Sequence, residues 1–168
     1  MIRAGILIIS DRCARGEMRD VTGPVLEEEL KRHRIEVVRI RYVADEQLDI
    51  LEWLREMADH DQLSLILTAG GTGLGPRDVT PEATRVVLER EATGLAEFLR
   101  QQTASSNAMS ALSRGTAGVR GKTLIVNLPG SPNGAVEWFQ HLVPLLEHAL
   151  QMIEGKGHGS LAELVVGS

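Results

Sequence analysis

The most informative segment of this sequence is LTAGGTGLG, residues 67–75, which places four glycines in the six positions from 70 to 75. It follows the apolar run 63–69, typical of a buried strand, and precedes a helical pattern that begins at Thr80-Pro81. Glycines let backbone N–H groups approach an anion closely, and Thr72 adds a hydroxyl donor. The segment therefore predicts a loop that binds phosphate or pyrophosphate. A glycine-rich turn without a ligand is the alternative.

Two better-known phosphate motifs do not fit. A dinucleotide fingerprint starting at Gly71 needs a glycine at position 76, where the chain has Pro76. A P-loop ending in Gly121-Lys122-Thr123 needs a glycine where the chain has Thr116, and it should follow a strand rather than precede one. Lys122 is therefore predicted to be a solvent-exposed residue at the start of a strand.

Short apolar runs alternate with longer stretches of helical spacing, which predicts the fold class. We expect strands at 6–9, 36–43, 63–69 and 123–128, and helices from residue 22 and at 46–59, 80–90, 94–102 and 131–153. Pro144 is expected to bend the last helix or to begin a second segment. The alternation predicts an α/β fold of three layers, doubly wound, with a mainly parallel sheet and helices on both faces.

The composition limits the function classes. With 18 basic and 23 acidic residues the net charge is −5, which argues against a nucleic-acid partner. Cys13 is the only cysteine, so an internal disulfide and a cysteine-based zinc site are excluded. The apolar start is too short to span a membrane and lacks a signal-peptide pattern, so no membrane partner and a cytoplasmic location are expected. We expect one domain at 1–154 and a flexible or loosely docked tail at 155–168.

Ligands of such a sheet bind at the carboxyl ends of its strands, and several polar residues follow those ends. They are Ser10, Asp11, Asp45, the glycine loop as far as Asp78, and the segment 127–132. Magnesium takes oxygen ligands, usually one or two carboxylates plus substrate phosphates, so the three aspartates predict a Mg²⁺ site. Any one of them alone would be read as a turn or cap residue. Asp20 would join them only if its loop folds over the site.

A further candidate is Leu112-Ser113-Arg114, in the weakly periodic stretch 105–119 where a binding loop is expected. The Arg114 guanidinium could donate two hydrogen bonds to one phosphate. A surface Ser-Arg pair without a ligand is the alternative, and the residues alone favour it.

Taken together, these motifs resemble the molybdopterin adenylyltransferase family of molybdenum-cofactor synthesis, the MogA/MoaB-like proteins that are similar to the gephyrin G domain. The combination of GGTG with RDVTPE is specific, whereas each piece alone would be weak. The pieces occur in the family's order over residues 5 to about 153: Ile9-Ser10-Asp11-Arg12, Asp45-Glu46, LTAGGTG (67–73), PRDVTPEAT (76–84), Leu112-Ser113-Arg114 and NLPGSP (127–132). The resemblance implies a molybdopterin-binding-domain-like fold.

The resemblance also implies an activity, the Mg²⁺-dependent transfer of AMP from ATP to the terminal phosphate of molybdopterin, which releases pyrophosphate. It implies that Asp45 and Asp78 are the catalytic and magnesium-binding residues. The substrate-binding positions that it implies are Ser10, Asp11, Gly70, Gly71, Thr72, Gly73, Ser113, Arg114, Asn127, Pro129, Gly130 and Ser131. It further implies a homotrimer or a hexamer, and hand-over of the product to a molybdate-inserting protein.

Two other functions remain open at this point. One is a non-catalytic molybdopterin- or nucleotide-binding protein of MoaB type, against which the presence of both Asp45 and Asp78 argues. The other is an assembly module, the role of the gephyrin domain in a larger scaffold. For the trimer, the sequence adds only the hint that some apolar helix residues need a partner: Leu95, Phe98, Leu99, Phe139, Leu142, Leu146 and Leu150.

Overall fold

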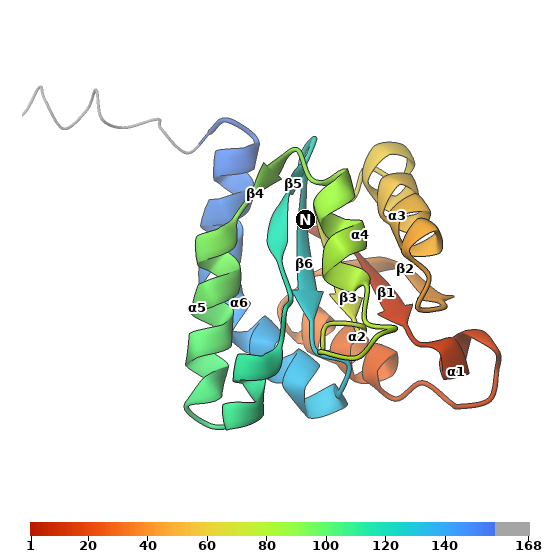
Figure 1. The fold of residues 1–168 in the computed structure, drawn as a ribbon. Helices are drawn as coiled ribbons and strands as arrows, with labels where there is room; N and C mark the ends of the chain where they lie inside the picture. The colour runs from red at the N-terminus through yellow and green to blue at the C-terminus, as the bar shows by residue number, and fades with distance from the viewer. Residues whose placement is uncertain (157–168) are drawn as a thin grey trace, which may run out of the picture.

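A six-stranded sheet forms the centre of the molecule in the computed structural model, which describes residues 1–156 (Figure 1). Its strand order is β2-β1-β3-β6-β5-β4. Four strands are parallel: β1 (Arg3–Ile9), β2 (Glu36–Val43), β3 (Leu65–Ala69) and β6 (Thr123–Leu128). The strands β5 (Ala117–Arg120) and β4 (Arg90–Glu91) complete one edge in antiparallel orientation. The mainly parallel α/β fold is thus confirmed, and all four predicted strands are present.

The register of the parallel strands aligns their carboxyl ends. Ile9 pairs with Val43, Ile8 with Ala69, and Ala69 with Leu128. The residues that follow these strands therefore begin at one edge of the sheet. In Figure 1 the loop after β3 lies beside the arrowheads of β1, β3 and β6.

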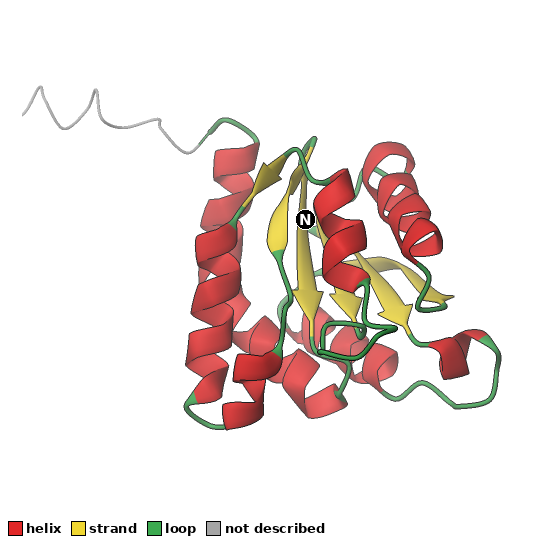
Figure 2. Ribbon diagram, in the orientation of Figure 1, coloured by secondary structure: helices red, strands yellow, loops and turns green. Residues whose placement is uncertain are grey.

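Helices cover both faces of the sheet (Figure 2). On one face lie α2 (Thr22–Arg32), α5 (Thr93–Ala104) and α6 (Pro132–Ile153), which share a core with Ile6, Leu67 and Val126. On the other face lie α3 (Gln47–Arg55), the π-helical turn η1 (Glu56–His60) and α4 (Thr80–Val87), which share a core with Leu7, Ile66 and Ile125. Alternate residues of each central strand thus enter opposite cores, as the pleat of a strand requires.

Several element bounds differ from the expected ones, and the differences in α6, in α4 and over 105–119 have the clearest physical causes. The α6 helix runs through Pro144 as a single helix, so no second segment begins there. The α4 helix begins at Thr80 as expected, after the N-cap residue Val79, but it ends at Val87 because the chain turns into β4. The stretch 105–119 holds the 3₁₀ turn η2 (Ala108–Leu112) and most of β5. A four-residue strand with a central glycine gives too weak a pattern to be seen in sequence.

Most apolar residues of α5 and α6 that could have served an interface are buried in the chain's own core. Leu99, Phe139, Leu142, Leu146 and Leu150 are at most 9% exposed, whereas Phe98 is 36% exposed. The hint of uncovered apolar surface therefore fails for these five residues. Of the expected tail, only Gly155 and Lys156 fall within the described residues. Within residues 1–156, no helix combines the length and apolar character that a membrane span requires.

Candidate active site at the carboxyl edge of the sheet

The glycine loop is held against the strand ends by contacts that leave no space for side chains. Gly70 has φ +108°, and a Cβ there would overlap the Ile9 carbonyl oxygen. Gly71 has φ +65°, and a Cβ there would overlap the Thr80 hydroxyl, which donates to the Gly70 carbonyl at 2.9 Å. Both positions favour glycine on conformation as well as on space. A Cβ on Gly130 would lie only 3.2 Å from Gly70 Cα, so the loops after β3 and β6 touch.

This loop presents unpaired backbone donors. Within residues 1–156, the N–H groups of Gly71, Thr72, Gly73 and Leu74 donate to no acceptor, although neighbouring amides such as Gly70 N and Gly75 N do. Successive free N–H groups in a turn form a concave site that attracts anions. These N–H groups are the donors that the phosphate-binding prediction requires, and phosphate binding here stays a prediction. Thr72 is 6% exposed as a whole residue, so it lies mostly beneath this surface.

Asp45 and Asp11 hold each other in place at the ends of β2 and β1. Asp11 N donates to Asp45 Oδ2 at 3.0 Å, and Asp45 N donates to Asp11 Oδ1, also at 3.0 Å. Burial raises the pKa of the Asp45 carboxyl, and the negative charges of Asp11 and Asp78 add to that rise. The hydrogen bond from Asp11 N acts in the opposite direction. Asp45 Oδ1 lies 3.2 Å from the position that a Cβ on Gly71 would take, so this carboxylate overhangs the glycine loop.

Asp78 overhangs the same loop further along. Its Oδ2 accepts from Gly75 N at 2.9 Å and lies 2.9 Å from the Cβ positions of both Gly73 and Gly75. The structure therefore brings Asp45 and Asp78 to one loop. Asp45 Oδ1 and Asp78 Oδ1 accept no hydrogen bond within residues 1–156.

The donors present fit a magnesium ion that would also use substrate oxygens. Two carboxylates over a phosphate loop match the usual environment of Mg²⁺, which retains waters and phosphate oxygens as further ligands. Within residues 1–156 there is no group of three or more His, Cys, Asp or Glu side chains arranged to hold a metal. The arrangement thus suits an ion that arrives with a nucleotide better than one held by protein alone. Asp20 does not take part, since its carboxylate accepts from Thr22 N and Gly23 N at the start of α2.

Arginines fix the outer part of the loop. Arg77 Nε and Nη2 donate to the Asp11 carboxylate at 2.8 and 3.1 Å, and Nη2 also donates to Glu46 Oε1 at 2.9 Å. Arg114 donates to the carbonyls of Gly73 and Asp78 at 2.8 and 2.7 Å and pairs with Glu82. Arg114 is therefore engaged with the loop backbone in this structure, and it has more contacts than a surface Ser-Arg pair would.

Ser113 lies next to the glycine loop, whereas Asn127 lies beneath it. Arg114 N donates to the Thr72 carbonyl at 2.8 Å, which brings the Ser113 segment to the site. Asn127 is fully buried; its side chain donates to the hydroxyls of Thr68 and Thr84 and accepts from Thr116 N at 3.1 Å. All of these amide contacts are internal, so in this structure Asn127 positions the neighbouring segments.

Two predicted serines act as helix caps in this structure. Ser10 Oγ accepts from Cys13 N at 3.3 Å at the start of α1 (Asp11–Ala14), and Ser131 Oγ accepts from Gly134 N at 3.1 Å at the start of α6. Pro129 and Gly130 lie in the loop after β6, and the Gly130 carbonyl accepts from the Thr22 hydroxyl at 2.8 Å. All these residues lie at the same edge of the sheet as the glycine loop.

Sequence reasoning missed Arg77 and Glu82 as contributors to the site. Both belong to RDVTPE, but spacing does not show that Arg77 reaches Asp11, 66 positions earlier in the chain. No local signal could have found that contact.

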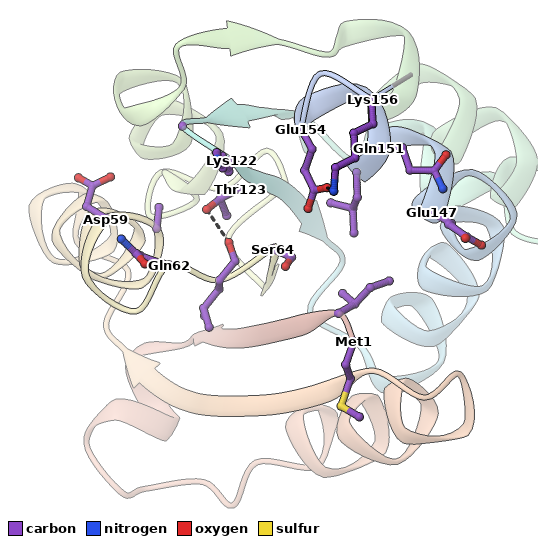
Figure 3. Close-up of a pocket in the computed structure, with 15 residues that line it drawn as sticks. Met1, Asp59, Gln62, Ser64, Lys122, Thr123, Glu147, Gln151, Glu154 and Lys156 are labelled. Carbon is purple, nitrogen blue, oxygen red and sulfur yellow. Dashed lines mark hydrogen bonds and ion pairs between the residues drawn. The ribbon is translucent and has the colours of Figure 1, made fainter. Parts of the chain in front are cut away.

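A separate cavity of about 770 Å³ lies at the opposite end of the sheet (Figure 3). It is lined by residues such as Met1, Asp59, Ser64, Lys122, Thr123 and Glu154. It contains none of the predicted site residues. The carboxyl edge, where those residues gather, is therefore the candidate site, and this cavity is not.

The protein is a doubly wound α/β protein, and a glycine loop and two carboxylates lie at the carboxyl edge of its sheet. Proteins of this class bind their ligands at that edge. The sequence matches the family described as "Probable molybdopterin binding domain" over residues 5–148, and the chain belongs to that family.

Three individual proteins are similar to this chain over most of its length. A molybdopterin adenylyltransferase of Helicobacter pylori (strain J99) is 36% identical over 156 residues, which is 92% of this chain and 89% of that protein. The molybdenum cofactor synthesis protein cinnamon of Drosophila melanogaster is 40% identical over 90% of this chain, but the chain spans only 26% of that protein. The molybdopterin biosynthesis enzyme MoaB of Thermus thermophilus has a solved structure that is 52% identical, with a TM-score of 0.88 over 93% of this chain and 98% of that one.

Proposed function

We propose that this protein transfers AMP from ATP to the terminal phosphate of molybdopterin, giving adenylyl-molybdopterin and pyrophosphate. The observation that carries the proposal is the pair of carboxylates, Asp45 and Asp78, over one loop of free backbone N–H groups. Relatives that are named molybdopterin adenylyltransferase and span most of this chain support it. Because ATP is the proposed co-substrate, the cytoplasm is the proposed location.

In the proposed reaction, an oxygen of the molybdopterin phosphate attacks the α-phosphorus of ATP. The bond from that phosphorus to the α–β bridging oxygen breaks, and pyrophosphate leaves with the electron pair. The free N–H groups of Gly71 to Leu74 would bind phosphate oxygens, which places the reacting groups and offsets their charge. Asp45 and Asp78 would hold Mg²⁺, which neutralises phosphate charge during such transfers.

The molybdopterin side of the site is assigned to Ser113 and to the loop Pro129–Ser131. Ser113 is partly exposed beside the glycine loop, and its hydroxyl accepts from Gly115 N at 3.2 Å. Asn127 would support this side indirectly, since its amide holds Thr116 N in place. Ser10, with its hydroxyl at the first strand end, would face the same substrate.

The test is incubation with molybdopterin, ATP and Mg²⁺, followed by mass spectrometry of the pterin product and an assay of pyrophosphate. We expect one pyrophosphate per adenylylated molybdopterin. Binding of both substrates without product would favour the non-catalytic MoaB-type protein, and binding of neither would favour an assembly module.

We further propose a homotrimer, or a hexamer built from trimers, that hands its product to a molybdate-inserting protein. The number of subunits, three or a multiple of three, comes from the resemblance to the family. Exposed apolar side chains such as Phe98 and Met152, 36% and 51% exposed, are compatible with contacts between subunits. Sedimentation at micromolar concentration tests it: the chain has a mass of 18.3 kDa, and a species of that mass would contradict the proposal.

A further inference from the structure

The Arg77 guanidinium is crowded on one side and free on another. Nη2 carries two hydrogens but has three acceptors: Asp11 Oδ1 at 3.1 Å, Glu46 Oε1 at 2.9 Å and the Asp45 carbonyl at 3.2 Å. Nη1 donates to no acceptor within residues 1–156. The edge formed by Nη1 and Nη2, which can take two parallel hydrogen bonds, is therefore used only through its Nη2 end.

The charges at this edge of the sheet are unfavourable for a polyphosphate unless a cation faces it. Asp11, Asp45, Glu46 and Asp78 all lie there, and each would repel ATP. Two arginines near the site are held by backbone carbonyls: Arg114 by those of Gly73 and Asp78, with the Glu82 carboxylate as a further partner, and Arg100 by those of Ser113 and Gly115. Among its acceptors within residues 1–156, Arg77 has only one carbonyl, and its side chain is 56% exposed, compared with 32% for Arg114.

The two carboxylate partners of Arg77 differ in how firmly they are held. Asp11 is bonded to the Asp45 backbone and takes the side-on pair of Arg77 donors, Nε and Nη2. Glu46 is 57% exposed, and its bond to Arg77 is the single hydrogen bond of its side chain within residues 1–156. Glu46 is therefore the partner that can leave without disturbing the loop.

We propose that Arg77 is a phosphate-binding residue that exchanges Glu46 for the polyphosphate of ATP. Asp11 keeps its side-on pair and orients the guanidinium. The phosphate takes the Nη1–Nη2 edge, where two parallel charge-assisted hydrogen bonds match a phosphate well. In the free protein, Glu46 occupies part of this edge and neutralises the arginine. This inference rests on the proposed function and names a residue that its substrate would contact.

Calorimetric titration with inorganic pyrophosphate, and separately with ATP, tests the exchange in the presence of Mg²⁺. Arg77→Ala should lower the affinity for each of the two ligands about tenfold, because a bidentate charge-assisted contact is lost. Arg77→Lys should recover part of this loss, because it keeps the charge without the fork. Arg120→Ala is the matched control. Arg120 forks onto the Asp59 carboxylate through Nε and Nη2 in the same way, and Asp59 lines the cavity at the opposite end of the sheet, so removal of Arg120 should change affinity little.

The Glu46→Gln variant tests whether phosphate replaces Glu46 on Arg77 or whether the Glu46–Arg77 ion pair is only structural. It should strengthen pyrophosphate binding severalfold in the wild-type background and much less in the Arg77→Ala background. The effects of the two substitutions would then be non-additive in a double-mutant cycle, as expected if Glu46 acts through Arg77. A gain of equal size in both backgrounds would mean simple repulsion and would overturn the proposal. Unchanged affinity in Arg77→Ala would also overturn it, with the proposed function intact. A wild-type protein that binds neither pyrophosphate nor ATP would overturn both. If Arg77→Ala does not fold, Glu46→Gln is compared between the wild type and Arg77→Lys.

Discussion

Asp11 and Asp45 each accept a hydrogen bond from the backbone N–H of the other, both at 3.0 Å, across the ends of two neighbouring strands. These two hydrogen bonds join residues that are 34 positions apart in the sequence. They fix the Asp45 carboxylate, which overhangs the glycine loop. The side chain of Asp11 thereby connects Asp45 to Arg77, and the geometry of the candidate site depends on it.

Asp11→Ala should therefore reduce turnover through the position of Asp45. Because small misplacements of reacting groups reduce rates strongly, we expect kcat to fall about 10- to 100-fold. Asp11→Asn keeps an oxygen that can accept from Asp45 N, so it should retain more activity than the alanine variant. Steady-state kinetics with ATP and molybdopterin measure this, and equal activity of the two variants would contradict a positioning role.

Asp78→Asn should remove catalysis with little effect on folding. The amide oxygen can still accept from Gly75 N, but the charge proposed to hold Mg²⁺ is lost. We expect kcat/KM to fall at least about 100-fold, and Tm to move by no more than about 2 °C. Asp49→Asn, on the exposed surface of α3, is the control and should keep wild-type activity. Near-normal turnover of Asp78→Asn would refute the two-carboxylate site.

The ion pair between Glu82 and Arg114 should make stability depend on pH. The hydrogen bond from Arg114 holds the pKa of Glu82 below its usual value of 4.5. For a carboxyl whose pKa is lowered on folding, the stabilisation is complete above the unfolded pKa and is lost as pH falls through the folded one. Glu82→Gln should therefore have a lower Tm than wild type at pH 7, and this difference should shrink progressively below about pH 4.5.

Thermal unfolding of both proteins from pH 7 to pH 3 measures that difference. Glu52→Gln on the exposed side of α3 is the control, since Glu52 makes no ion pair within residues 1–156. A wild-type to Glu82→Gln difference in Tm that stays constant over this range would mean that the charge of Glu82 contributes nothing to stability.

Gly70→Ala should damage the fold itself. Its φ of +108° is unfavourable for any side chain, and the added Cβ would overlap the Ile9 carbonyl. Gly121→Ala is the matched control, because Gly121 has φ +56° but nothing within 4 Å of the added Cβ. The control should lose about 1–2 kcal/mol through conformation alone, which corresponds to about 2–8 °C in Tm. Gly70→Ala should lose at least twice as much, and a similar Tm for the two variants would show that the loop can move away from β1.

Much of the fold could be predicted because its signals are local. The bounds 36–43 and 123–128 match β2 and β6, since the alternating pattern of the first and the apolar run of the second are both characteristic of strands. The antiparallel strands β4 and β5 could not be predicted. They have two and four residues, and they exist through pairing with each other and with β6 rather than through their own pattern.

The sequence by itself determined the order of the elements, the place of the glycine loop, and the three aspartates that follow strand ends or their loops, because each depends on neighbours within a few residues. Only the tertiary structure decided which carboxylate and which arginine meet. It bound Asp11 to Asp45 and Arg77, and it buried Asn127 among three threonines. It also turned Phe139 and Leu142 into the chain's own core rather than toward a partner. Such contacts join residues tens of positions apart, so their energy depends on how strands are aligned and helices packed, and no local pattern records it.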